Sequence, residues 1–222
     1  FFKFYEEQFF PYLKENNIKH CIHMGDIMDR RKFLSYRIAK DFRERFVERF
    51  AELGVELHVM VGNHDTYFKN TNDVNAVTEL LGDRYPNIKI YPEAAEITFD
   101  TLNVLFVPWI NASNYASTMT SISDSRADMC MGHLEIVGFE MIRGMKNEHG
   151  INKSIFTKFD TVFSGHFHHK SDDGHIYYLG SPYEFYWNDC EDKKGFHILD
   201  TETRNLERII NPRTIHKKIY YD

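Results

Sequence analysis

The sequence contains few cysteines, and they form no pair that could hold a metal ion or act as a redox centre. Cys21, Cys130 and Cys190 are an odd number, lie far apart and belong to no C-x-x-C motif. We therefore expect free thiols in a reducing cytosol.

Long apolar runs and targeting signals are also lacking. No uninterrupted apolar stretch approaches the roughly 20 residues that span a bilayer. The chain does not open with the charged, apolar and small-residue segments of a secretory signal. We expect a cytoplasmic protein with no membrane partner.

Basic residues are not in excess. The 27 Lys and Arg residues are outnumbered by 33 Asp and Glu residues, and the formal net charge is −6. Because neutralisation of phosphates supplies most non-specific affinity for nucleic acids, this balance argues against binding through bulk positive charge. It does not exclude a nucleic-acid enzyme that carries metal cations.

Hydrophobic residues are plentiful, at 42% of the chain with 15% aromatic, and 222 residues suit one compact domain. This composition excludes a disordered chain, a collagen and a coiled coil. Apolar residues at every fourth position predict one helix from Phe1 through Leu13, ended by Asn16, and a second helix over 34–53, ended by Gly54.

Short apolar and β-branched segments predict the strands. They lie at 18–24, 55–61, 88–91, 97–99, 102–107, 129–132, 161–164, 176–179, 196–199 and 215–220. Strands alternate with helices in the first half, and the second half is mostly strands. The pattern predicts a layered α/β domain with at least one mixed sheet.

Four polar clusters each follow a predicted strand and begin with a glycine, which lets the backbone turn sharply at the end of the strand. They are Gly25-Asp26-Ile27-Met28-Asp29, Gly62-Asn63-His64-Asp65, Gly132-His133-Leu134-Glu135 and Gly165-His166-Phe167-His168. Ligand sites in α/β sheets form at the carboxyl ends of strands. The clusters can therefore converge although they are far apart in the sequence.

Together the clusters offer carboxylates, imidazoles and one amide, without a thiolate. This donor set suits Mn²⁺, Fe²⁺ or Zn²⁺ better than Ca²⁺, which prefers oxygen alone. A carboxylate can bridge two cations about 3.5–4 Å apart, and such a pair can clamp a phosphate ester and generate hydroxide.

In this order, G-D-x-x-D, G-N-H-D, G-H-x-E and G-H-x-H resemble motifs of the calcineurin-like metallophosphoesterase superfamily. G-N-H-D and G-H-F-H, followed by Gly180-Ser181-Pro182 and Gly195-Phe196, resemble the SbcD-type nuclease subunits of double-strand-break repair complexes. Asn63 through Asn70, Val107-Pro108-Trp109 and Arg143-Gly144-Met145-Lys146 are similar to the nuclease subunits of the recombination endonucleases of T-even-like phages. The likeness extends over essentially the whole chain.

The resemblance implies an α/β/β/α sandwich of two mixed sheets flanked by helices, over residues 1–222. The family also has an Asp-x-His on its first strand, and none occurs upstream of Asp26. Because the chain opens in a helix at Phe1, we expect an N-terminally truncated domain whose first strand is missing. We likewise expect the C-terminal DNA-capping and ATPase-docking regions of the family to be absent.

The resemblance also implies roles for individual residues. Asp26 would bridge two divalent ions, for which we expect Mn²⁺. Asn63, His133 and His166 would complete the shell of the second ion, and His168 would bind the first. With two of its four family ligands, the first site would be incomplete in this chain, so metal should prefer the second site.

His64 is expected to face the phosphate and to protonate the leaving oxygen as a general acid. By resemblance, the carboxylate of Asp29 would orient His64, and Asp65 would fix the loop. Basic residues flank the clusters and either grip DNA phosphates or are ordinary solvated charges: Arg30, Arg31, Lys32, Lys69, Arg143 and Lys146. The other histidines, His20 and His58 among them, are expected to be surface or strand-packing groups.

The resemblance implies a metal-dependent DNA nuclease subunit, with 3′ to 5′ exonuclease activity on duplexes and endonuclease activity on single strands. Its partners would be DNA, an SMC-like coiled-coil ATPase of the SbcC type and a second copy of the chain. The helix over 34–53 either makes the dimer contact or packs on a sheet. If a phage encodes the chain, its location is the host cytoplasm. The alternatives are a phosphatase or cyclic-nucleotide phosphodiesterase, and a non-catalytic module that binds DNA ends or docks on the ATPase.

Overall fold

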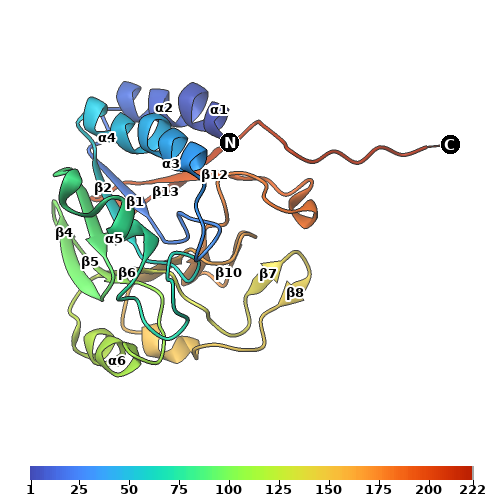
Figure 1. Cartoon of the computed structure of the whole chain (residues 1–222). Coiled ribbons are helices and arrows are strands. Elements are labelled where there is room, and N and C mark those ends of the chain that lie inside the picture. Colours follow the sequence, from blue (N-terminus) through green and yellow to red (C-terminus); the bar gives the residue numbers. More distant parts are fainter. Residues whose placement is uncertain (222) are drawn as a thin grey trace.

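The computed structural model describes residues 1–221 and has the four expected layers (Figure 1). One layer of helices, two sheets and a second layer containing helix α6 (Tyr115–Asp124) follow one another. Three clusters of buried side chains fill the spaces between these layers. The expected α/β/β/α sandwich is therefore confirmed.

The first sheet has three parallel strands in the order β1 (His20–His23), β2 (Glu56–Met60) and β3 (Ile88–Tyr91). Within residues 1–221 it contains no antiparallel pair, so only the second sheet is mixed as expected. Residues of alternate parity face opposite layers. Leu57 and Val59 pack under the helices, whereas Met60 packs against the second sheet.

The second sheet has six strands and is parallel in its centre with antiparallel edges. Its order is β10 (Ser171–Asp172), β11 (Ile176–Tyr178), β9 (Thr161–Ser164), β6 (Met129–Gly132), β5 (Leu102–Val107) and β4 (Ala95–Phe99). The central strands are almost entirely buried, because both of their faces are covered.

Two long helical segments cover the first sheet, and each is interrupted by a π-helical turn. The first consists of α1 (Phe2–Phe4), η1 (Tyr5–Phe9) and α2 (Phe10–Glu15), and the second of α3 (Tyr36–Phe42), η2 (Arg43–Val47) and α4 (Glu48–Leu53). The second begins at a Ser35 cap and ends at Gly54, whose φ of 65° is left-handed.

The apolar stripe of the second helical segment divides into two parts. Phe46 and Phe50 are buried against the sheet and the first helices, as a sheet-packing helix requires. Tyr36 and Ile38, on α3, are exposed. Sheet packing therefore accounts for the half of the stripe that includes η2 and α4.

Several short elements complete the fold. They are α5 (Ala76–Leu80), the 3₁₀ turns η3 (Gly82–Arg84), η4 (Lys153–Phe156) and η5 (Trp187–Asp189), the hairpin of β7 (Glu140–Ile142) and β8 (Met145–Lys146), and the hairpin of β12 (Gly195–Leu199) and β13 (Leu206–Ile210). Within residues 1–221 no helix has the length and apolarity needed to cross a membrane.

The expected strand at 215–220 is wrong. This segment lies in the terminal tail that extends away from the domain (Figure 1), and it forms no strand. Ile219 and Tyr220 are exposed, so the alternating pattern has no neighbouring strand to pair with. Instead, β13 pairs antiparallel with β12, and the sequence analysis missed β13 and the short strands β7, β8 and β10.

Candidate metal centre

Loops at the carboxyl ends of four parallel strands meet at one place, and the strands come from both sheets. Asp26 follows β1, Asn63 follows β2, His133 follows β6 and His166 follows β9. The ends of β1 and β2 face those of β6 and β9 across the sandwich. The four loops therefore approach each other at one edge of the two sheets.

The ligand atoms of these four residues form a compact group. His133 Nε2 lies 2.9 Å from Asn63 Oδ1 and 3.3 Å from Asp26 Oδ2. His166 Nδ1 lies 3.0 Å from Asn63 Oδ1 and 3.1 Å from His133 Nε2. Two ligands about 2.0–2.2 Å from one cation are separated by roughly such distances.

The hydrogen bonding of His133 shows that the group suits a cation. Its Nδ1 lies 2.7 Å from the carbonyl oxygen of Met24, which can only accept a hydrogen bond, so Nδ1 carries a proton. In the neutral ring Nε2 then presents a lone pair to the Asn63 oxygen, and two lone pairs at 2.9 Å repel each other. A shared positive charge, from a proton or a metal ion, relieves that repulsion, so the residues fit a divalent ion.

The charges of the group agree with this arrangement. Burial would raise the pKa of Asp26, but His133 and the His64 backbone N–H hold it well below its usual range. Burial lowers the pKa of His166 to about 3, so its ring is neutral and can act as a ligand at neutral pH. For His133, burial lowers the pKa but the Asp26 carboxylate outweighs that effect, and the net pKa is raised.

Two positions in the motifs must be glycine because neighbouring loops approach their backbone too closely for a Cβ atom. A Cβ on Gly62 would lie under 3.0 Å from the backbone nitrogen and carboxylate of Asp26. A Cβ on Gly25 would meet the His133 ring and the Gly62 Cα, the latter at 2.9 Å. Only glycine lets these loops pack so tightly that their side chains share one ligand position.

The loop of Asp65 is held by its own carboxylate, as the sequence analysis expects. Asp65 accepts hydrogen bonds from the backbone N–H groups of Asp26, Gly62 and Met28, at 2.8, 2.8 and 3.0 Å. Asp65 is fully buried. Burial and the nearby charge of Asp26 raise its pKa to about 7, although the hydrogen bonds from the backbone lower the pKa in part. Asp65 therefore ties the β1 loop to the β2 loop.

His64 lies between the same two loops. Its backbone N–H donates to Asp26 Oδ1 at 2.7 Å, and its ring Nδ1 lies 2.7 Å from the carbonyl oxygen of Asp29. The expected contact with the Asp29 carboxylate is wrong. That carboxylate is exposed and lies 3.9 Å from Arg30, so the main chain of Asp29, not its side chain, orients the ring.

His168 is not part of the compact group, which contains Asp26, His133 and His166. Its ring packs against the rings of Phe185 and Tyr186, with centroids 4.8 and 5.7 Å away. Burial lowers its pKa. The structure therefore places His168 in a separate aromatic setting beside the centre.

A buried lysine, which no sequence motif marks, fixes the main chain at His168. Lys194 Nζ donates to the carbonyl oxygen of His168 at 2.7 Å and to the carboxylates of Asp189 and Asp192 at 3.0 and 2.9 Å. Asp192 also contacts His169 Nδ1 at 3.0 Å. A lysine in a polar stretch of sequence gives no sign that it will be buried.

Trp109 and His23 are further neighbours of the centre that the sequence analysis did not assign to it. The Trp109 ring lies 5.3 Å from that of His166, between centroids, and its V-P-W motif was the available signal. Burial lowers the pKa of His23 to about 4, and its Nδ1 has no hydrogen-bond partner within the described residues.

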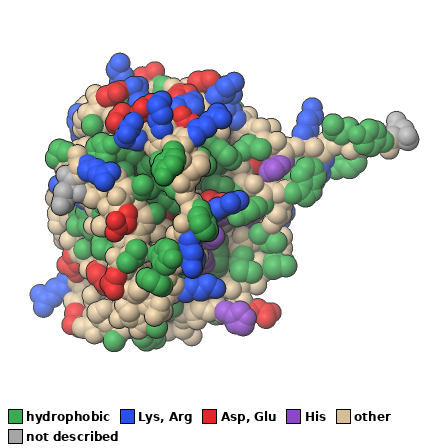
Figure 2. Space-filling model, in the orientation of Figure 1, with side chains coloured by type: hydrophobic (Ala, Val, Ile, Leu, Met, Phe, Trp, Pro, Cys, Tyr) green, Lys and Arg blue, Asp and Glu red, His purple; other side chains and the backbone are tan. Residues whose placement is uncertain are grey.

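Basic side chains surround the centre. Figure 2 shows histidine side chains in a hollow bordered by Lys and Arg side chains. Arg31 donates to Thr66 Oγ1 at 2.8 Å, and Lys32 lies over the Tyr67 ring at 4.8 Å. The other candidates for DNA contact are exposed: Arg30, Lys69, Arg143 and Lys146, the last on the β7–β8 hairpin.

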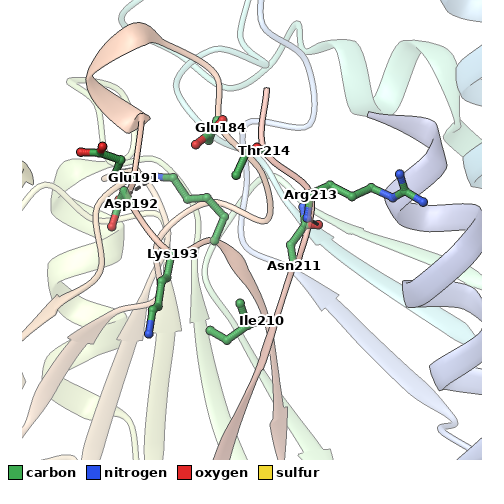
Figure 3. Close-up of a pocket in the computed structure, with 9 residues that line it drawn as sticks. Glu184, Glu191, Asp192, Lys193, Ile210, Asn211, Arg213 and Thr214 are labelled. Carbon is green, nitrogen blue, oxygen red and sulfur yellow. Dashed lines mark hydrogen bonds and ion pairs between the residues drawn. The ribbon is translucent and has the colours of Figure 1, made fainter. Parts of the chain in front are cut away.

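A separate pocket lies between the 184–194 segment and the C-terminal segment (Figure 3). Glu184, Asp192, Asn211 and Arg213 are among its lining residues. None of the metal ligands, nor His64, lines it. The pocket therefore belongs to a different part of the surface.

Comparison with known proteins adds a family and relatives. The sequence model of the family described as calcineurin-like phosphoesterase matches residues 5–170. Exonuclease subunit 1 of Enterobacteria phage T4 is 37% identical over 215 residues, which cover 97% of this chain and 62% of that protein. The chain thus spans less than two thirds of the length of this relative.

One solved structure shares the fold at low sequence identity. It has a TM-score of 0.58 at 12% identity, with 93% of both chains covered. Another, described as a novel archaeal phosphodiesterase, has a TM-score of 0.46 at 15% identity and covers 92% of this chain and 90% of its own.

Proposed function

The chain belongs to the calcineurin-like phosphoesterase family, and on that premise we propose that it is a metal-dependent DNA nuclease that hydrolyses phosphodiester bonds with two divalent ions. One observation carries the proposal. The ligand atoms of Asp26, Asn63, His133 and His166 come from four loops and lie within about the span of one coordination sphere. The name of the phage relative, an exonuclease subunit, supports a nucleic acid as the substrate class, and the family resemblance implies DNA.

Asp26, Asn63, His133 and His166 would hold one ion, and Asp26 with His168 would contribute to a second. Divalent ions bound there would neutralise charge on the phosphate ester and supply hydroxide near neutral pH. Mn²⁺ fits the mixed nitrogen and oxygen donors of the site. Because Met24 fixes the protonated nitrogen of His133, that ring keeps its lone pair directed at the ligand position.

His64 would serve as the general acid. Its Nδ1 donates to the Asp29 carbonyl oxygen, so Nε2 is the ring nitrogen left to face a substrate. A proton given to the leaving oxygen must therefore come from Nε2. The backbone bond from His64 to Asp26 fixes the distance between the acid and the metal ligands, which is the positioning that general acid catalysis needs.

DNA would contact the rim of the hollow. Arg30, Lys32 and Lys69 are exposed near the β1 and β2 loops, and Arg143 and Lys146 project on the β7–β8 hairpin. Local positive charge of this kind holds phosphates even on a chain with a net charge of −6. These contacts would position the backbone of the DNA without reading its sequence.

The proposal extends to the assembly. The relative is named as a subunit, which supports a partner protein, and the family resemblance indicates an SMC-like coiled-coil ATPase in a repair or recombination complex. A homodimer is proposed as well, with the exposed residues Tyr36 and Ile38 of α3 as its contact.

Two substrates distinguish the candidate activities. The chain is incubated with Mn²⁺ and either linear duplex DNA or bis(p-nitrophenyl) phosphate, beside an Asp26→Asn variant as the matched control. DNA degradation that the variant lacks supports the nuclease. Hydrolysis of bis(p-nitrophenyl) phosphate without any cleavage of the DNA would instead indicate a phosphodiesterase for small substrates. Cleavage of neither substrate would indicate a non-catalytic module.

A further inference from the structure

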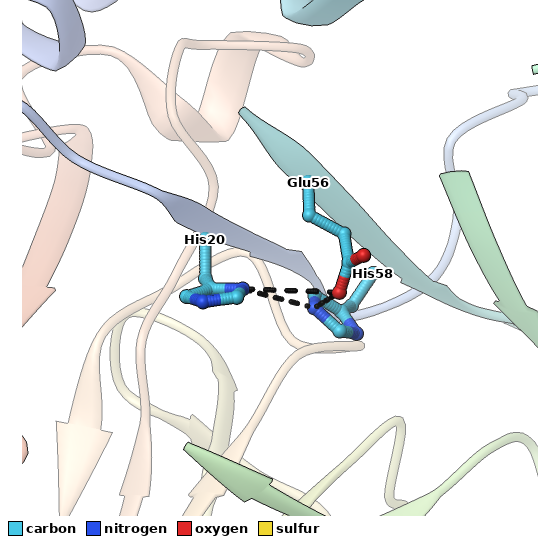
Figure 4. A group of neighbouring side chains, drawn as sticks. All are labelled: His20, Glu56 and His58. Atoms are coloured by element: carbon cyan, nitrogen blue, oxygen red, sulfur yellow. Dashed lines mark hydrogen bonds and ion pairs between the residues drawn. The ribbon is translucent and has the colours of Figure 1, made fainter. Parts of the chain in front are cut away.

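A second group of potential metal ligands lies at the opposite end of the first sheet. His20 begins β1, and Glu56 and His58 lie on β2, where the register pairs His20 with Glu56 (Figure 4). β1 and β2 are parallel, and the candidate metal centre follows their carboxyl ends. The three side chains therefore lie at the amino ends, on the face that points toward the second sheet.

The ligand atoms of this group are as close as a single ion requires. His58 Nε2 lies 3.0 Å from Glu56 Oε1 and 3.4 Å from His20 Nδ1, and His20 Nδ1 lies 3.9 Å from the same Glu56 oxygen. Two ligands of a tetrahedral zinc ion are about 3.4 Å apart when the bonds are 2.0–2.1 Å. All three separations are near that value without any movement of the backbone.

The surroundings hold the rings in place. His58 Nδ1 lies 2.8 Å from the Tyr91 hydroxyl, whose oxygen can accept a hydrogen bond from Nδ1–H and so leave the Nε2 lone pair free to bind a metal. Phe99 packs edge-on against both imidazoles, with centroids 5.2 Å from His20 and 5.0 Å from His58. The group is thus preorganised by a hydrogen bond and an aromatic wall.

Charge and exposure suit a bound cation with one open position. Burial lowers the pKa of His58 to about 4 and outweighs the Glu56 carboxylate, which raises it. The His58 ring is therefore neutral at pH 7. Lys89 lies opposite His58 on β3, and its positive charge also lowers the pKa of His58. Its ammonium group donates to the carbonyl oxygen of Pro86 at 3.2 Å. Nearly half of the His20 side chain is exposed, so water can reach the group.

We propose that His20, Glu56 and His58 bind one Zn²⁺ ion that links β1 to β2, with water as the fourth ligand. Two imidazoles and one carboxylate are an established zinc donor set, and the absence of thiolate favours exchangeable binding. Without the ion, the neutral His58 ring can carry its N–H on Nε2 and donate to Glu56, whereas with the ion bound the N–H is on Nδ1 and donates to the Tyr91 hydroxyl. The site is independent of the nuclease proposal, because it shares no residue with the candidate metal centre.

Zinc stoichiometry tests the site. The chain, His20→Ala, Glu56→Gln and, as a matched control, His149→Ala are each loaded with Zn²⁺, desalted and analysed for metal. His149 is an exposed histidine outside both groups. We expect one zinc ion fewer per chain in His20→Ala, weaker retention in Glu56→Gln, and no change in the control.

Thermal unfolding provides the second measurement. Zn²⁺ should raise the thermal unfolding midpoint of the unmodified chain and of His149→Ala by more than it raises the midpoint of His20→Ala. In EDTA all three proteins should unfold at similar temperatures. Mn²⁺-dependent DNA cleavage should be unchanged in His20→Ala. Equal zinc content and equal zinc-induced shifts in all four proteins would overturn the proposal and leave a metal-free hydrogen bond between His58 and Glu56.

Discussion

Replacing Lys194 with Met should strongly destabilise the domain and disturb the loop of His168. The Lys194 side chain is 2% exposed and donates to three acceptors: the carbonyl oxygen of His168 and the carboxylates of Asp189 and Asp192. Removing one partner of a buried ion pair costs about 3–5 kcal/mol, because the remaining charge is left uncompensated. For a chain of this length, that loss lowers the unfolding midpoint by on the order of 10 °C.

The neighbouring Lys193 provides a matched control. Its side chain is exposed, and Lys193→Met should change the free energy of unfolding by no more than about 0.5 kcal/mol. Urea unfolding at pH 7 measures both variants. A loss below about 1 kcal/mol in Lys194→Met would refute the argument that this lysine compensates the buried Asp189 and the partly buried Asp192.

The pH dependence gives an independent check of the same network. Burial raises the pKa values of Asp189 and Asp192, but hydrogen bonds, including those from Lys194, outweigh it, and both values are lowered. A carboxyl with a lowered folded pKa stabilises the protein above its unfolded value of about 3.9, and the stabilisation is lost as pH falls through the folded pKa. The difference between the chain and Lys194→Met should therefore be largest near neutral pH and shrink in acid.

Three further variants test the candidate centre and the proposed DNA contacts beside it. His64→Ala should retain metal and lose DNA cleavage by about 10²–10⁴-fold, as measured by metal analysis and single-turnover digestion, and normal turnover would remove His64 from the mechanism. Gly62→Ala should abolish metal retention, because its Cβ would displace Asp26, and an unchanged metal content would contradict the close packing of these loops. Arg143→Ala combined with Lys146→Ala should weaken DNA binding and reduce its dependence on salt, while hydrolysis of a small aryl phosphodiester stays constant. Equal salt slopes before and after the double substitution would assign these two residues to ordinary solvated surface.

The sequence was sufficient to predict the layers and the loops that meet at the candidate centre. Hydrophobic spacing marked the two long helices and the buried strands, and a glycine followed by polar residues marked each strand end. These signals are local, and parallel strands convert them into proximity because their carboxyl ends share one edge. The four clusters could therefore be expected to converge, and the family resemblance implied Asp26, Asn63, His133 and His166 as the ligands of one ion.

The prediction failed where local pattern and tertiary contact disagree. The segment 215–220 alternates like a strand but has no partner, and β13 was missed because Leu206–Ile210 is partly charged and half-exposed. Asp29 illustrates the same limit at the site, since the family resemblance implies that its carboxylate orients His64. Its carbonyl oxygen makes the contact instead, and a sequence does not show which atom of a residue faces a neighbour.

The group at His20 shows why the pairing register matters as much as the elements themselves. His20, Glu56 and His58 share a face only because β1 pairs with β2 so that His20 lies opposite Glu56. A shift by one residue would turn His20 toward the helices, where Cys21 and Leu57 now pack, and would separate it from His58. Since neither strand contains a recognisable metal motif, the register creates the potential zinc ligands, and a measurement of zinc binding is also a test of that register.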